Sequence, residues 1–285
     1  MNFNKIAIIG VGLIGGSFAL AMRKNGFKGT ITGVGRNLAN LQKAREIGMI
    51  DEYTTSPAEG VTDADLVQLA SPVGQFPKIM REIGNNLRPG CIVTDVGSIK
   101  SEVIKMLEPL MPQGTTFVGA HPIAGRECSG IDCATPDLFE DARCIITPGK
   151  QTDLHAIETV AAMWEKLGST IIEMSPEDHD QTFAAVSHMP HIVAYTLVNT
   201  IDGMDKDNML KLGGKGLKDM TRIALSSPGL WSDICSYNRD AILHSLKAFS
   251  AEISRASDAV ESSDWEGLKN IFENANRARN IIEQD

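Results

Sequence analysis

The sequence contains no apolar run that approaches the roughly 20 residues needed to cross a bilayer. Its amino terminus, MNFNKIAIIG, has one lysine before a short apolar run and lacks the small-residue cleavage site of a secretory signal. Positive charge is in deficit, because 27 Lys and Arg face 36 Asp and Glu, for a formal net charge of −9. This balance argues against a nucleic-acid partner, and the short apolar runs argue against a membrane one. We therefore expect a cytoplasmic protein.

Paired cysteines are also missing from the sequence. The five cysteines are an odd number without a C-x-x-C pair, and they stand at positions 91, 128, 133, 144 and 235. Neither a disulfide framework nor a zinc site is expected from this pattern. We predict reduced, mostly buried thiols and no bound metal.

The sequence does have the composition of an ordinary globular protein, with 42% hydrophobic and 22% charged residues among 285, a length that suits two domains. Apolar runs of strand length recur at 6–10, 30–35, 65–70, 91–96, 116–121, 144–148 and 169–174. Amphipathic segments with helical periodicity separate most of them, for example at 39–47, 76–87 and 154–167. This alternation predicts βαβ units and a parallel sheet.

The pattern changes at residue 175, after which no convincing strand follows. The segment SPEDHD predicts a helix start, with Ser175 as the N-cap and Pro176 at the first helical position. Long amphipathic stretches fill the remainder, at 178–203, 208–226, 229–259 and 264–283. We therefore predict an α/β domain over 1–174 and an all-helical domain over 175–285.

A glycine-rich turn follows the first predicted strand. In IAIIGVGLIGGS, Gly10, Gly12 and Gly15 have the G-x-G-x-x-G spacing between a strand and a helix. The first glycine permits a tight turn, the second lets the backbone approach a pyrophosphate, and the third lets the helix pack on the strand. The helix start at Leu13 and Ile14 offers free N–H groups to the phosphates. This pattern predicts a Rossmann dinucleotide-binding domain, and a tight turn without a ligand is the alternative.

No acidic residue ends the second strand, where NAD-binding Rossmann domains usually have one. The segment GVGRN places Gly35 and Arg36 there. An arginine binds a 2′-phosphate that a carboxylate would repel, so the sequence favours NADP over NAD. The alternative is an Arg36 side chain that stacks on the adenine or points to solvent. At the end of a later strand, Ser71 and Pro72 are expected to border the nicotinamide, unless they form a plain turn.

Two polar residues follow neighbouring predicted strands. The segment DVGSIK contains Ser98, and TFVGAHPIAG contains His121. The carboxyl ends of strands face the ligand crevice in an open α/β sheet, so we expect both side chains beside the nicotinamide. Pro122 holds the His121 backbone extended, which suits an imidazole fixed as a general base. A structural histidine is the alternative.

Over essentially its whole length the chain resembles the TyrA-type prephenate/arogenate dehydrogenases. The resemblance rests on GVGLIGGS, DVGSIK, GAHPIAG, AVSHMPH (185–191) and the GGKGLKDMTRIA…LWSDI run (213–234). It implies a Rossmann domain followed by a helical domain that pairs two subunits into a homodimer. It also implies NAD(P)-dependent oxidative decarboxylation of prephenate to 4-hydroxyphenylpyruvate in tyrosine biosynthesis. An arogenate or dual-specificity cyclohexadienyl dehydrogenase, which gives tyrosine directly, is the alternative.

The same resemblance assigns roles to individual residues. It makes His121 the catalytic base and Ser98 its hydrogen-bonding partner. It places a second set of side chains in the substrate site, with the last histidine facing the ligand and the arginine binding a carboxylate: Ser187, His188, His191 and Arg222. A planar guanidinium suits bidentate binding of a carboxylate.

These substrate residues have plainer interpretations when the family is set aside. His188 and His191 are three apart, so they share a helix face and could be half-buried residues or a weak metal site. Arg222 could pair with Asp219 or Asp233.

Two other functions compete with the dehydrogenase of tyrosine biosynthesis. A β-hydroxyacid dehydrogenase or imine reductase also joins a Rossmann domain to helices, but the K-x-x-x-N spacing of the hydroxyacid group does not occur in this sequence. A non-catalytic NADP sensor would leave GAHPIAG and Arg222 unexplained.

Overall fold

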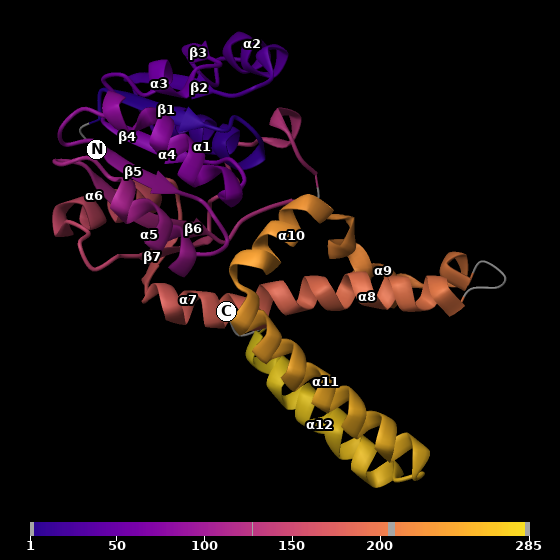
Figure 1. The fold of residues 1–285 in the computed structure, drawn as a ribbon. Coiled ribbons are helices and arrows are strands. Elements are labelled where there is room, and N and C mark those ends of the chain that lie inside the picture. Colours follow the sequence, from indigo (N-terminus) through magenta and orange to yellow (C-terminus); the bar gives the residue numbers. More distant parts are fainter. Residues whose placement is uncertain (1–2, 127, 205–208, 283–285) are drawn as a thin grey trace. The chain divides into compact units, whose positions relative to one another are not determined.

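The computed structural model describes residues 3–126, 128–204 and 209–282 (Figure 1). The chain forms two compact units, of which one ends at Asn238 and the other begins at Arg239. The first unit contains the whole sheet and the candidate site. Within the described ranges, no helix combines the length and the apolar character needed to cross a membrane.

The sheet of the first unit has eight strands in the order β3-β2-β1-β4-β5-β6-β7-β8. The strands are β1 Lys5–Ile9, β2 Thr30–Val34, β3 Glu52–Thr54, β4 Leu66–Leu69, β5 Ile92–Asp95, β6 Thr116–Pro122, β7 Arg143–Thr147 and β8 Thr170–Glu173. Pairing is parallel from β3 across to β6, and the strand order reverses between β1 and β4. This is the predicted Rossmann topology, in which a dinucleotide lies at the reversal point.

Alternate side chains of β1 belong to two hydrophobic cores, one on each face of the sheet. Ile6 and Ile8 join the first core, whereas Ala7 and Ile9 join the second. The helices that supply the first core are α1 Leu13–Lys24 and α6 Leu154–Lys166, and those that supply the second are α4 Phe76–Ile83 and α5 Ser101–Leu107. Burial on both faces explains why these strands read as continuous apolar runs in the sequence.

Two features of the sheet differ from the prediction. The short strand β3 was not predicted, because its three residues EYT form no apolar run. The sheet is also not wholly parallel, since β7 runs antiparallel to β6. Parallel neighbours are usually joined through a helix, whereas the described residues of the β6–β7 connection contain only the 3₁₀ turn η4 Ile131–Cys133.

From residue 175 onward the described chain is helical, as predicted. Ser175 caps the first helix by accepting a hydrogen bond from the Asp178 backbone N–H at 3.0 Å, and Pro176 begins that helix. The elements are α7 Pro176–Phe183, the π-helical turn η5 Ala184–His188, α8 Met189–Met204, η6 Met209–Leu212, α9 Lys215–Thr221, η7 Arg222–Leu225, α10 Pro228–Tyr237, α11 Arg239–Glu261 and α12 Trp265–Ile282. Residues 208 and 283, which bound two predicted stretches, lie outside the described residues.

The stretch predicted as continuous over 229–259 is interrupted at Asn238. Its backbone has φ −110° and ψ 35°, outside the helical region. The Asn238 side-chain amide donates a hydrogen bond to the Asp180 carbonyl at 2.8 Å. This long-range contact fixes the break between α10 and α11.

Two helices predicted from the sequence agree closely with helices of the structure, and a few short elements complete the first unit. The predicted helices at 39–47 and 76–87 correspond to α2 Leu38–Glu46 and to α4 with its 3₁₀ extension η2 Gly84–Asn86. The other short elements are α3 Pro57–Gly60, η1 Val73–Gln75 and η3 Glu108–Leu110.

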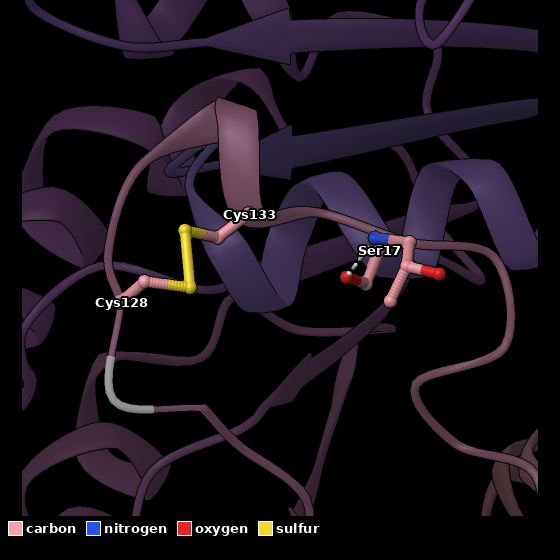
Figure 2. The surroundings of a disulfide bond; sticks show 4 residues. Ser17, Cys128 and Cys133 are labelled. Carbon is pink, nitrogen blue, oxygen red and sulfur yellow. Dashed lines mark hydrogen bonds between the residues drawn. A yellow bond between two sulfur atoms is a disulfide. The ribbon is translucent and has the colours of Figure 1, made fainter.

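A disulfide joins Cys128 and Cys133 in the segment that follows β6 (Figure 2). The prediction of reduced thiols throughout was therefore wrong for this pair. The turn η4 brings the two Cα atoms to 6.1 Å, within disulfide range, whereas the sequence argument considered only a multi-bridge framework. Cys91 and Cys144 are free and buried, and Cys235 is free and half-buried.

Candidate functional site

A cleft of about 980 Å³ opens at the carboxyl ends of β1, β2 and β4. We call it the nucleotide cleft. Five of the residues predicted to bind a cofactor line it, namely Gly10, Gly12, Arg36, Ser71 and Pro72. The others, Leu13, Ile14 and Gly15, lie in the first turns of α1 directly after the glycine loop.

The three glycines of the loop perform three different tasks. Gly10 has φ +108°, and a Cβ there would lie 2.5 Å from the Ala70 carbonyl oxygen at the end of β4. A Cβ on Gly15 would lie 2.1 Å from the Gly10 carbonyl oxygen, so this glycine permits close helix–strand packing. Gly12 has no atom within 4 Å of its Cβ position and therefore leaves open space for a ligand.

The amino terminus of α1 is free to bind an anion. Gly12 is its N-cap and supplies no side-chain cap, and no acidic residue lies in its first turn. The unpaired N–H groups and the helix dipole favour a phosphate there. The loop and the helix start thus fit the pyrophosphate of a dinucleotide.

The end of β2 carries positive rather than negative charge. Gly35 and Arg36 line the nucleotide cleft, and Asn37 caps α2 by accepting a hydrogen bond from the Asn40 backbone at 3.2 Å. Lys78 of α4 also lines the cleft. Glu82 of the same helix lines the cleft as well, so side chains of both charges face it.

His121 lies on β6 and is the end of a buried hydrogen-bonded chain. Its Nδ1 lies 2.8 Å from Nε2 of His179, and Nδ1 of His179 lies 2.8 Å from Oδ1 of Asp180. The Asp180 carboxylate also accepts hydrogen bonds from the backbone N–H groups of Lys100 at 2.7 Å and Ser101 at 2.9 Å. His179 and Asp180 both lie on α7, in the SPEDHD segment. The sequence predicted a helix start there but did not indicate a role for these two side chains.

A buried ion pair lies beside this chain. Lys100 and Asp95 are fully buried and joined through Nζ and Oδ2, and Nζ also donates to the Ala120 carbonyl at 2.9 Å. Asp95 accepts hydrogen bonds from the backbone N–H groups of Ala120 at 3.1 Å and Gly97 at 2.8 Å. The pair therefore ties the end of β5 to the residue before His121.

The electrostatics of the chain keep both imidazoles neutral. Burial lowers the pKa of His121 well below its ordinary value, and the positive charge that His179, Lys100 and His188 would place nearby lowers it further. Burial also lowers the pKa of His179, against the opposing hydrogen bond to Asp180. For Asp180 burial acts to raise the pKa, but the hydrogen bonds from His179 and Lys100 outweigh it, so the pKa is lowered and the group is a carboxylate.

His188 lies on the π-helical turn η5 and is fully buried. Its Nδ1 contacts the Asn238 amide at 3.2 Å, and its ring also faces the Ser98 backbone. Burial lowers its pKa to about 4. We call His121, His179, Asp180 and His188 the imidazole cluster.

His191 is partly exposed and lies on α8, three residues after His188. Its Nδ1 donates a hydrogen bond to the Ser187 carbonyl at 2.9 Å, which leaves Nε2 as an acceptor. Its ring stacks on Trp231 with centroids 3.6 Å apart, and the same indole meets His188 edge-on at 6.0 Å. Burial lowers the pKa of His191. The π turn is of the kind often found at functional sites.

The structure brings only some of the predicted residues together. Ser98 faces His188 through its backbone, and among the described contacts His121 bonds to His179 rather than to the Ser98 hydroxyl. Arg222 is exposed at the start of η7, which packs beside α8, and the Tyr195 hydroxyl of α8 donates to the carbonyl of Ser226, directly after η7, at 2.6 Å. Within the described ranges, no group of His, Cys, Asp and Glu side chains is arranged to hold a metal ion.

A cleft that fits a dinucleotide and a neutral imidazole at the carboxyl end of the same sheet define an NAD(P)-dependent dehydrogenase of the Rossmann class. The family model for "Prephenate dehydrogenase, nucleotide-binding domain" matches residues 18–173, and that for "Prephenate dehydrogenase, dimerization domain" matches residues 175–274. The chain belongs to the prephenate dehydrogenase family, as the sequence resemblance implied.

Individual relatives agree with this assignment. Prephenate dehydrogenase from Bacillus subtilis is 37% identical over 95% of this chain and 74% of the relative. Cyclohexadienyl dehydrogenase from Zymomonas mobilis is 34% identical over 99% of this chain and 97% of the relative. The crystal structure of prephenate dehydrogenase from A. aeolicus, in complex with hydroxyphenyl propionate and NAD⁺, matches with a TM-score of 0.93 and 36% identity, over 100% of this chain and 99% of that one.

Proposed function

We propose that the protein catalyses the NAD(P)-dependent oxidative decarboxylation of prephenate to 4-hydroxyphenylpyruvate, a step of tyrosine biosynthesis. The observation that carries the proposal is the neutral, buried His121, whose Nδ1 is held by His179 at the carboxyl end of β6. The A. aeolicus relative was solved with NAD⁺ and an aromatic carboxylate, which supports the same substrate class here.

The chemistry requires one proton acceptor and a fixed substrate. Prephenate carries a hydroxyl at C4 and a carboxylate at C1 of its ring. His121 accepts the hydroxyl proton through Nε2, and a positioned base of this kind accelerates a reaction by roughly 10²–10⁴. Ser71 and Pro72 would border the nicotinamide and the glycine loop would hold the pyrophosphate, and the bound cofactor would accept the hydride that leaves C4. The C4 ketone is conjugated to C1, so the carboxylate leaves as CO₂ and the ring becomes aromatic.

Substrate binding is proposed for the residues around η5 and η7. A dianionic substrate must be attracted locally, because the protein carries a formal net charge of −9. Arg222 is an exposed arginine on the element that packs beside α8, and His191 on α8 offers an acceptor nitrogen. Ser98, Ser187 and His188 complete the proposed site.

Arogenate remains the alternative substrate, although it is not favoured over prephenate. It differs in carrying a protonated amine where prephenate has a keto group. A crystal structure of arogenate dehydrogenase from Synechocystis matches at 28% identity and a TM-score of 0.80. The more similar Bacillus subtilis relative is a prephenate dehydrogenase. A non-catalytic NADP sensor has no use for the buried His121–His179–Asp180 chain.

The proposed cofactor preference is NADP. Arg36 and Lys78 line the nucleotide cleft, and the end of β2 has no carboxylate. Arg36→Ala should lower kcat/KM with NADP about tenfold, the loss of one phosphate contact of about 1.4 kcal/mol, and leave NAD unchanged. Arg81→Ala, at an exposed arginine of α4 outside the residues that line the cleft, is the matched control. Equal use of both cofactors by the unmodified enzyme and by Arg36→Ala would remove the preference.

A homodimer and a two-domain organisation are also proposed. The dimerization-domain match covers residues 175–274, and α11 and α12 expose large apolar side chains at Ile253, Val260, Trp265 and Phe272. The domain boundary near residue 174 is supported by the change of element type there and by the two family models meeting at 173 and 175. Cytoplasmic localisation stays a prediction.

The test is a two-by-two assay of reduced-nicotinamide absorbance, with prephenate or arogenate and with NAD or NADP. We expect turnover with prephenate in the NADP cell. Turnover with arogenate alone would exchange the substrate, and a folded, nucleotide-binding protein that is silent in all four cells would overturn the proposed function.

A further inference from the structure

The Asp180 carboxylate fixes the direction of the hydrogen bonds in the imidazole cluster. Its two oxygens receive the backbone N–H groups of Lys100 and Ser101, and a backbone N–H can only donate. An ionised carboxylate can only accept. The hydrogen bond of 2.8 Å between Oδ1 of Asp180 and Nδ1 of His179 must therefore be donated by the imidazole.

The proton position in the second imidazole follows from the first. A neutral imidazole has one donor nitrogen and one acceptor nitrogen. Because Nδ1 of His179 carries the proton, its Nε2 is an acceptor. The contact of 2.8 Å to Nδ1 of His121 must then be donated by His121. A His121 protonated on Nε2 would instead place two lone pairs against each other at that distance.

A doubly protonated His179 would also satisfy the geometry, but its surroundings oppose it. His179 is fully buried, as is Lys100, whose ammonium faces the cluster from the start of α5, and His188 faces it from η5. The acidic groups that face the cluster are Asp180 and Asp95, and the latter is already paired with Lys100. Burial and the lysine charge together favour the neutral ring.

We propose that His179 and Asp180 are positioning residues that hold His121 as its Nδ1-protonated tautomer and so leave Nε2 as the lone pair that accepts a proton. The proposal rests on the proposed function for its catalytic consequence, but the tautomer itself is a property of the protein without substrate. Two side chains of α7 thereby orient a base that lies on β6.

The direct test is two-dimensional ¹H–¹⁵N NMR of the full-length protein labelled in histidine, with His121→Asn used to assign the resonance among six histidines. We expect His121 to be protonated on Nδ1 near neutral pH. An Nε2-protonated His121 in the unmodified protein would overturn the proposal, whatever substrate the enzyme uses. The NMR experiment needs no turnover, so it tests the tautomer alone. The assay with prephenate and arogenate tests the proposed function separately.

A matched pair of variants tests the catalytic consequence. The amide of His179→Asn reaches Asp180 in place of Nδ1 but is too short to replace Nε2, whereas His179→Gln can present an amide oxygen to His121. We expect His179→Asn to lower kcat about 10- to 100-fold, a part of the effect of a positioned base, with KM and nucleotide binding little changed. His179→Gln should restore part of kcat.

The pH profile distinguishes positioning from a merely structural role. In His179→Asn the acid limb of kcat/KM should move to lower pH, because His121 loses the acceptor of its Nδ1–H hydrogen bond, an interaction that favours the protonated imidazole. A loss of folded protein would reduce activity equally at every pH, and thermal unfolding of both variants detects it. If His179→Asn has the same kcat as the unmodified enzyme and the acid limb of its kcat/KM profile does not shift, the positioning role is contradicted.

Discussion

The nucleotide cleft and the imidazole cluster lie on one sheet but are built in different ways. The cleft is shaped by backbone, because two glycines permit approaches that a Cβ would block and a third leaves its space empty. The cluster is shaped by side chains from distant segments, and its central hydrogen bond joins positions 58 apart. The cleft can therefore be damaged by adding one carbon atom, and the cluster by removing one hydrogen bond.

The largest expected effect is on chemistry alone. His121→Asn removes the proposed base and should lower kcat by roughly 10²–10⁴, while nucleotide binding measured by fluorescence titration stays unchanged. This result would separate the two regions functionally. Undiminished turnover would show that another group accepts the proton.

The second effect is on stability in acid. The folded-state pKa of His188 is about 4, below the ordinary 6.5, so between these values the unfolded chain binds more protons than the folded one. The free energy of unfolding should therefore fall as pH decreases from 6.5 to 4, by on the order of 3 kcal/mol for His188. His121, His179 and His191 act in the same direction. Urea unfolding at several pH values measures the slope, and His188→Asn should flatten part of it.

The third effect separates two glycines of one loop. Gly15→Ala forces a Cβ against the Gly10 carbonyl oxygen and should lower the free energy of unfolding by about 1–3 kcal/mol. Gly12→Ala meets no protein atom, so its stability should change by less than about 0.5 kcal/mol. It should nevertheless weaken nucleotide binding about tenfold, because the added methyl occupies ligand space. Equal destabilisation by both changes would contradict this division.

The fourth effect, for which no change in catalysis is expected, concerns the segment that follows β6 and contacts α1. The Thr135 backbone N–H donates to the Ser17 hydroxyl of α1 at 3.0 Å, near the Cys128–Cys133 disulfide (Figure 2). Reduction, or Cys133→Ser, should lower the free energy of unfolding by about 2 kcal/mol, the value for closing so short a loop. We expect kcat and cofactor KM to be nearly unchanged. A large change in both would show that this segment contributes to catalysis.

The difference between the regions also explains what the sequence could predict. The Rossmann topology and the glycine tasks follow from local spacing, so GVGLIGGS in its strand–helix context was sufficient. His179 and Asp180 were missed because their meaning arises only when α7 packs against the ends of β5 and β6. The strand β3 was missed because so few residues carry no periodicity. The disulfide was missed because an odd cysteine count says nothing about a single local pair.

The contacts of Asn238 have a consequence for recombining this enzyme with others. The Asn238 amide donates to the Asp180 carbonyl and contacts His188, so the last residue of the first compact unit touches two members of the imidazole cluster. A chimera joined near residue 174 would separate His121 from the residues that orient it. The smallest transplantable module that keeps the base and its partners together ends at Asn238, and α11 and α12 are the part that can be exchanged.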